Sequence, residues 1–226
     1  MLRERNGIDV ISEFMRYLAR HDIPDAQGLP ALTELSRELG VSVASLREQL
    51  EVARALGLVD VRPRVGIRRL PYTFRPAVRQ SLSYALTLDE GQFQKYADLR
   101  NHIETAYWEE AVSRLTDDDK LELRGLVARA REKLSRRSAQ VPHEEHRNLH
   151  LLIYRRLENP FLMGLLEAYW DAYEAVGLNM FTGSFEYLQE VWDFHEVMVE
   201  SICNGNYQAG RDALVKHIDL IYHRPG

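Results

Sequence analysis

The sequence has little of several features on which whole classes of protein depend. Cys203 is the only cysteine in 226 residues, which excludes an internal disulfide and a cysteine-based zinc finger. No apolar run approaches the roughly 18–20 residues of a membrane-spanning helix. The charged N-terminus MLRERNGIDV lacks the apolar stretch of a secretory signal. The chain also lacks a net positive charge: its formal net charge is −5. We therefore expect a globular protein of the cytoplasm that makes no contact with a membrane.

Charge is unevenly distributed along the chain. Residues 1–77 carry twelve arginines, no lysine and ten acidic residues, whereas the remainder has an excess of acidic residues. Four arginines follow each other within eight positions without an acidic residue between them: Arg62, Arg64, Arg68 and Arg69. Such an asymmetry predicts two parts with different tasks, of which the basic part faces an anion.

The N-terminal pattern predicts a winged helix-turn-helix. Apolar spacing indicates a helix that ends before His21, a short helix between Pro30 and Gly40, and a third helix from a Ser42 cap to about Leu56. Two alternating segments around residues 62–66 then predict a β-hairpin. Prolines 71 and 76 bracket a linker, so we expect a DNA-binding domain over residues 1–72 and a second domain over residues 76–226.

The second part shows helical periodicity and no alternation typical of strands. It predicts an all-α antiparallel bundle of about seven helices, near residues 76–86, 89–114, 117–137, 143–157, 160–177, 185–203 and 206–222. The whole chain is therefore predicted to be mainly α.

Candidate DNA contacts lie at the start of the third helix. The second helix of a helix-turn-helix motif, which is the third predicted helix of this chain, reads bases with its N-terminal side chains. Here these are Ser42, Ser45 and Arg47. Arg47 can pair with guanine or with phosphate. The alternative is that Arg47 pairs with Glu51 on a solvated face.

The hairpin offers a second contact with DNA. Arg62 and Arg64 can reach phosphates or the minor groove beside the recognition helix. Gly66 permits the tight turn between the two strands.

Residues 29–70 carry a series of short motifs: Leu29-Pro30, Ser36 to Leu39, Gly40-Val41-Ser42, Arg47-Glu48 with Leu50, Gly57-Leu58, and Val61 through Gly66. In these motifs the segment resembles the N-terminal domain of GntR-type transcription factors. The resemblance implies that Arg37 contacts the DNA backbone, that Arg47 lies on the operator face and that Gly66 marks the wing tip. The chain has Val43 where the family usually has arginine, and Ala44-Ser45 where it has Thr-Pro, so an operator sequence does not carry over.

Four histidines predict a metal site in the bundle. His146 and His150 are four residues apart on one helical face, on a stripe with apolar residues. His195 and His217 flank a predicted turn at residues 204–206 and stand about 14–17 Å from it, hence level with each other. A single buried histidine is usually a hydrogen-bonded core residue, but burying four unpaired imidazoles is costly. We expect a divalent ion, zinc or nickel.

The second part resembles the FadR-like branch of the same family, with its FCD-type ligand-sensing domain. The resemblance implies a helical bundle around a pocket, in which an aspartate four residues before a histidine holds a metal with two later histidines. His146 occupies the aspartate position. Arg100 and Glu104 match an Arg-x-x-x-Glu pattern near the pocket, and either anchor an acidic effector or form a structural ion pair.

These features together predict a metabolite-responsive regulator of transcription. We expect a homodimer on double-stranded operator DNA, with affinity changed by a small organic acid at the metal and Arg100. A metal-dependent enzyme and a pure metal sensor are the alternatives. A zinc protease is excluded because no glutamate follows His146 in the sequence His146 to His150, and we expect no catalytic residues.

Overall fold

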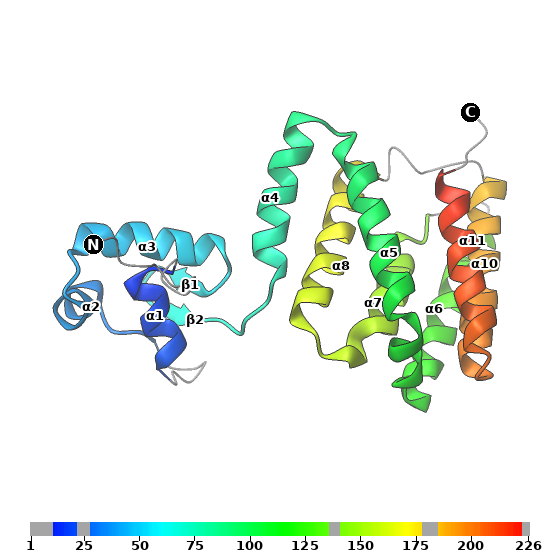
Figure 1. Cartoon of the computed structure of the whole chain (residues 1–226), viewed down its shortest axis with the longest axis horizontal. Coiled ribbons are helices and arrows are strands. Elements are labelled where there is room, and N and C mark those ends of the chain that lie inside the picture. The colour runs from blue at the N-terminus through cyan, green and yellow to red at the C-terminus, as the bar shows by residue number, and fades with distance from the viewer. Residues whose placement is uncertain (1–10, 22–27, 136–140, 178–184, 223–226) are drawn as a thin grey trace, which may run out of the picture. The chain divides into compact units, whose positions relative to one another are not determined.

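A computed structural model describes residues 11–21, 28–135, 141–177 and 185–222. The described chain is mainly helical, with one two-stranded antiparallel sheet (Figure 1), which confirms the predicted fold class. It forms two compact units, Met1–Gln80 and Ser81–Gly226. The predicted end of the helix at residues 117–137 lies outside the described residues. None of the helices in the described ranges has the length and apolar character of a membrane span.

The N-terminal unit has the predicted order of three helices and a hairpin. Ser12 caps the first helix, since its hydroxyl oxygen accepts a hydrogen bond from the Met15 N–H, and Ser42 caps the third in the same way. Gly40 ends the second helix in the left-handed conformation, with φ of 65°. The core of the unit is built around the fully buried Phe14 and Leu46. Its elements are α1 (Glu13–Arg20), α2 (Leu32–Leu39), α3 (Val43–Ala55), β1 (Val59–Arg62) and β2 (Gly66–Arg69).

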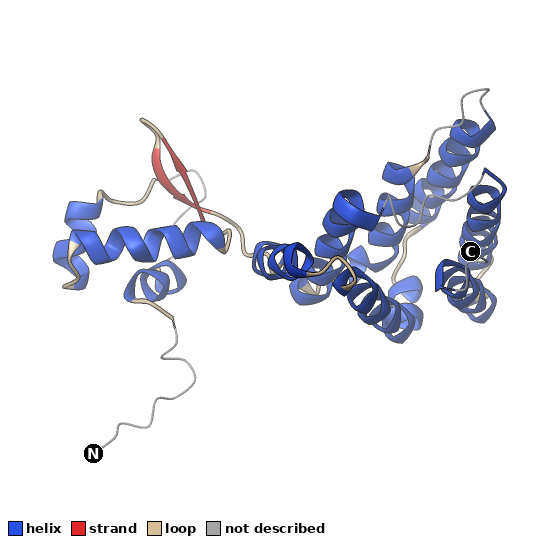
Figure 2. Cartoon of the chain, turned by 90° about the horizontal axis from the view of Figure 1, so that it is seen from above, coloured by secondary structure: helices blue, strands red, loops and turns tan. Residues whose placement is uncertain are grey.

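The hairpin projects from the three helices as a wing (Figure 2). Val59 pairs with Arg69 and Arg62 pairs with Gly66, which leaves residues 63–65 as the turn. Arg64 and Gly66 both have positive φ, 63° and 94°, so the chain reverses through two left-handed residues. The tip of the wing therefore carries an arginine in the left-handed conformation, and its side chain is exposed.

The C-terminal unit packs its helices around two apolar clusters, and in the larger one α10 (Phe185–Cys203) contacts both α11 (Tyr207–Tyr222) and α6 (Asp117–Ser135) (Figure 1). Trp108 and Trp192 are almost completely buried there. Asn159 caps α8, with Pro160 at its first position. The helices are α4 (Arg75–Leu88), which crosses the boundary between the units, α5 (Gln92–Ser113), α6 (Asp117–Ser135), α7 (His143–Tyr154), α8 (Pro160–Ala172), α10 (Phe185–Cys203) and α11 (Tyr207–Tyr222).

Two predicted helices are less regular than their periodicity indicates. The last turn of the predicted helix 143–157 is a 3₁₀-helix, η2 (Arg155–Leu157), which ends at Glu158 with φ of 52°. The last part of the predicted helix 160–177 is a π-helix, η3 (Tyr173–Gly177). Apolar spacing does not distinguish these helix types, because all of them keep the same face buried over a single turn.

Candidate functional site

The four histidines meet in the interior of the C-terminal unit. His146 and His150 come from α7, His195 from α10 and His217 from α11. His146 is 8% exposed and the other three are fully buried. All six pairs of ring centroids are separated by 4.3–5.7 Å. Across the described ranges, this is the one group of histidine, cysteine or carboxylate side chains placed to hold a metal ion.

The spacing of the four rings fits a metal ion. Nitrogen ligands about 2.0–2.1 Å from a tetrahedral ion lie about 3.3 Å apart, with ring centroids about 5 Å apart. The Nε2 atoms of His150 and His195 are 3.1 Å apart. The ligand atoms of the whole set lie within 4.8 Å of one another, so an ion would draw the widest pair inward. Both ring nitrogens of His217 and Nε2 of His146 are buried without a hydrogen-bond partner among the described residues, and an ion would supply a partner for one nitrogen of each ring.

The histidines are held in the neutral form that a metal requires. Burial lowers the pKa of His146, His195 and His217 well below the ordinary value, and neighbouring histidines lower it further. Burial also lowers the pKa of His150, against the opposing effect of Glu104. His195 donates its Nδ1–H to the Val191 carbonyl over 2.7 Å, which leaves the Nε2 lone pair free toward the other rings.

Arg100 and Glu104 lie beside His150, on the side away from His195. Both side chains come from α5, and they are 2% and 0% exposed. Their charged groups are 2.8 Å apart. Arg100 Nη2 is 2.7 Å from His150 Nδ1, and Glu104 Oε2 is 3.2 Å from the same atom. The ion pair lowers the pKa of Glu104 against the effect of burial, which alone would raise it, so the pair is charged.

A narrow opening connects this cluster to the surface. Its lining includes His146, His217, His143, Tyr173 and Tyr187. The cavity volume is about 20 Å³, which is room for about one water molecule. The π-helix η3 contributes Tyr173 to this opening, in keeping with the frequency of π-turns at functional sites. A ligand larger than water must therefore displace side chains at the opening.

Two residues beside the cluster were missing from the sequence-based prediction. His143 stacks on Tyr173 with ring centroids 5.3 Å apart, and its Nε2 is 3.1 Å from a Glu174 carboxylate oxygen. It precedes His146 by three residues, so helical spacing could have placed it on the same face. Trp170 is fully buried with its ring 4.7 Å from His146, and its indole N–H has no acceptor in the described part of the chain.

The candidate DNA-binding residues occupy the turn and the start of α3. The Ser42 hydroxyl caps the helix, and the Ser45 hydroxyl accepts a hydrogen bond from Gln49. Arg47 is exposed. Glu51, its proposed alternative partner, instead forms an ion pair with Arg54 over 2.6 Å. The alternative pairing of Arg47 with Glu51 is absent among the ion pairs of these described residues, and the Arg47 side chain is exposed.

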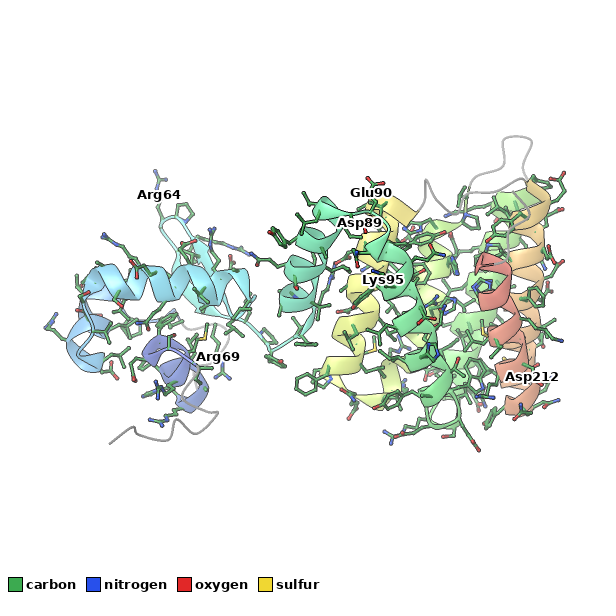
Figure 3. The ribbon with its side chains drawn as sticks, turned by 45° about the horizontal axis from the view of Figure 1, so that its top comes forward. Arg64, Arg69, Asp89, Glu90, Lys95 and Asp212 are labelled. Atoms are coloured by element: carbon green, nitrogen blue, oxygen red, sulfur yellow. The ribbon has the colours of Figure 1, made fainter. Side chains whose placement is uncertain are left out.

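The wing and α2 present further arginines. Arg64 lies at the tip of the hairpin and points away from the helices of its unit (Figure 3). Arg62 forms an ion pair with Asp60 over 2.6 Å, so its guanidinium is less free to bind another anion than that of Arg64. Arg37 is exposed on α2.

The N-terminal unit has the helix order and wing of a winged helix-turn-helix, a DNA-binding motif, and the C-terminal unit is a helical bundle with a buried histidine cluster. The family model "FCD domain" matches residues 96–220, more than half of the chain. The chain belongs to the FCD-domain family, and the resemblance to GntR-type regulators is confirmed. No curated protein sequence matches the chain.

Two solved structures share the fold over nearly the whole chain. Streptococcus agalactiae GntR is similar with a TM-score of 0.69 and 18% identity, over 92% of this chain and 94% of that one. E. coli McbR/YncC is similar with a TM-score of 0.50 and 17% identity, over the same shares of the two chains. At these identities the comparisons support the fold, whereas residue roles must be argued from this chain.

Proposed function

We propose that the protein is a regulator of transcription whose affinity for operator DNA is changed by a small carboxylate bound at a metal ion in the C-terminal unit. The observation that carries the proposal is the convergence of His146, His150, His195 and His217 from three helices, beside a buried Arg100. Bound metal would supply a local positive charge that attracts an acidic ligand.

The charges of the site favour an anionic effector. The four histidines are neutral and the Arg100–Glu104 pair carries no net charge, so a divalent ion would leave the site with a net charge of about +2. With aspartate at the position of His146, the same site would be less positive by one charge. Imidazole ligands suit zinc, nickel and copper, of which we propose zinc or nickel. A carboxylate can join a four-coordinate ion as a further ligand.

A metal-dependent enzyme is less well supported. Four histidine ligands fill a tetrahedral ion, so an activated water could bind only as a fifth ligand, at the position that we propose for the carboxylate effector. Glu104, the carboxylate nearest to His150, lies on the Nδ1 side of that ring and is paired with Arg100, so it does not face the ion as a general base would. A pure metal sensor uses the same residues and differs only in needing no effector.

The DNA-binding unit would act in pairs. One winged helix offers too few base contacts for specific binding, so we propose a homodimer that places two α3 helices in successive major grooves of a pseudo-palindromic operator. Such a regulator works in the compartment that holds the chromosome, which for a bacterial protein is the cytoplasm.

The test begins with selection of bound sequences from random duplex DNA, followed by fluorescence anisotropy on the selected site. We expect wild-type protein to select one motif, and the double substitution Arg47→Ala with Arg64→Ala to lose affinity for it. Arg129→Ala, on α6 in the other unit, is the matched control. Equal affinity of the double variant and wild type, or no enrichment of any motif, would refute the DNA-binding part of the proposal.

A further inference from the structure

Arg100, His150 and His195 form a chain of hydrogen bonds whose direction can be assigned. Arg100 can only donate, so His150 Nδ1, 2.7 Å away, accepts. A neutral imidazole that accepts at Nδ1 carries its hydrogen at Nε2. This hydrogen points at His195 Nε2, 3.1 Å away, which is an acceptor because His195 carries its own hydrogen at Nδ1 for the Val191 carbonyl. The chain therefore runs without conflict from Arg100 to Val191.

This arrangement prevents His150 from binding a metal ion through Nε2. A ligand nitrogen must offer a lone pair, and in this tautomer the Nε2 lone pair is replaced by a hydrogen. The other tautomer, with hydrogen at Nδ1, frees Nε2 but puts two donors, Nδ1–H and the Arg100 N–H, against each other. Glu104 Oε2, 3.2 Å from Nδ1, is an acceptor placed to receive that hydrogen.

We infer that Glu104 is the positioning residue that holds His150 in its metal-binding tautomer. When metal binds, the hydrogen-bond partner of His150 Nδ1 changes from Arg100 to Glu104. This inference rests on the proposed metal site. The proton at Nε2 of His150 passes to solvent and a proton from solvent is taken up at Nδ1, so the ring stays neutral and no net proton is released from it. The Arg100 N–H that pointed at His150 then has no acceptor there and can donate to a ligand carboxylate.

The inference couples the two ligands of the site. Without metal, Arg100 is engaged by both Glu104 and His150. In the metal-bound protein Arg100 keeps Glu104 as its only partner of the two. The carboxylate of an effector therefore gains Arg100 as a charged donor only when metal is bound. Glu104 and Arg100 thus have opposite effects on metal binding, because one stabilises the ligating tautomer and the other stabilises the competing tautomer.

The experiment measures zinc affinity by competition with a chromophoric chelator in wild-type protein, Glu104→Gln and Arg100→Met. Outer-shell partners of ligating histidines typically contribute about 10–100-fold in metal affinity. We expect Glu104→Gln to weaken zinc binding within that range and Arg100→Met to leave it equal or tighter. The control Glu109→Gln, an exposed glutamate on the same helix, should equal wild type. Unfolding with chelator present checks that each variant folds.

Nitrogen-15 NMR of labelled histidines reads the tautomer directly, with His150→Gln used to assign the His150 signals. We expect hydrogen at Nε2 of His150 in metal-free protein and at Nδ1 after zinc is added. A Nδ1–H tautomer in the metal-free protein, unchanged zinc affinity in Glu104→Gln, or equal losses in Glu104→Gln and Arg100→Met would overturn the inference. If wild-type protein binds no zinc at all, the proposed metal site fails instead.

Discussion

The metal-free protein should lose stability as the pH falls below the pKa of a histidine in an unfolded chain. Three of the buried histidines, His146, His195 and His217, have a folded pKa well below the value of about 6.5 in an unfolded chain. Between these two pKa values the unfolded chain binds protons that the folded chain does not. Unfolding is therefore favoured as the pH is lowered through 6.5, and stability is regained above it.

The size of the effect follows from the number of histidines. At pH 5.5, one pH unit below the unfolded pKa, each such histidine lowers the free energy of unfolding by about 1.4 kcal/mol. Three of them lower it by about 4 kcal/mol.

The assay is urea unfolding at pH 7.5 and pH 5.5 with a chelator present, followed by tryptophan fluorescence. The three tryptophans, Trp108, Trp170 and Trp192, all belong to the C-terminal unit, so the signal reports that unit alone. His217→Leu should reduce the pH-dependent loss by about 1.4 kcal/mol. His102→Ala, whose side chain is 77% exposed, should leave the loss unchanged. An unfolding free energy that does not change between the two pH values would refute the reasoning.

Three further predictions concern DNA binding, packing and metal. Arg47→Ala should weaken binding to the selected DNA site by about 1–3 kcal/mol in anisotropy while thermal unfolding stays unchanged, and equal affinity would count against base contact by α3. Asp119→Asn should lower the unfolding free energy by about 1–3 kcal/mol in urea, because the buried carboxylate pairs with Arg155 and Arg156; an unchanged value would show that these pairs contribute nothing. Zinc at about a thousand times its Kd should stabilise the protein by about 4 kcal/mol and raise Tm by roughly 8–16 °C, and His217→Ala should lose that rise.

Much of the architecture could be predicted because its causes are local. Ser42 as a cap and Gly40 as a helix end each act within one turn, and the structure has both at the predicted positions. The hairpin follows from alternation on either side of Gly66. Helical rise alone predicted that His195 and His217 lie level, and the structure places their ring centroids 4.3 Å apart.

The environment of the candidate site could not be predicted in the same way. Spacing indicated that Arg100 faces inward, but its contact with His150 joins residues fifty positions apart and depends on how α5 packs against α7. The choice of Arg54 over Arg47 as partner of Glu51 depends on rotamers rather than on spacing, since both lie within one helical turn of it. The burial of Trp170 beside His146 likewise follows from packing between helices.

The central claim is that these four histidines bind a metal ion, and metal content tests it most directly. Protein reconstituted with zinc or nickel and then freed of excess ion should contain one ion per chain by elemental analysis and native mass spectrometry. His217→Ala should contain none, while His102→Ala should match wild type. Wild-type protein without stoichiometric metal, or His217→Ala with as much metal as wild type, would contradict the account and leave the four histidines as a polar core.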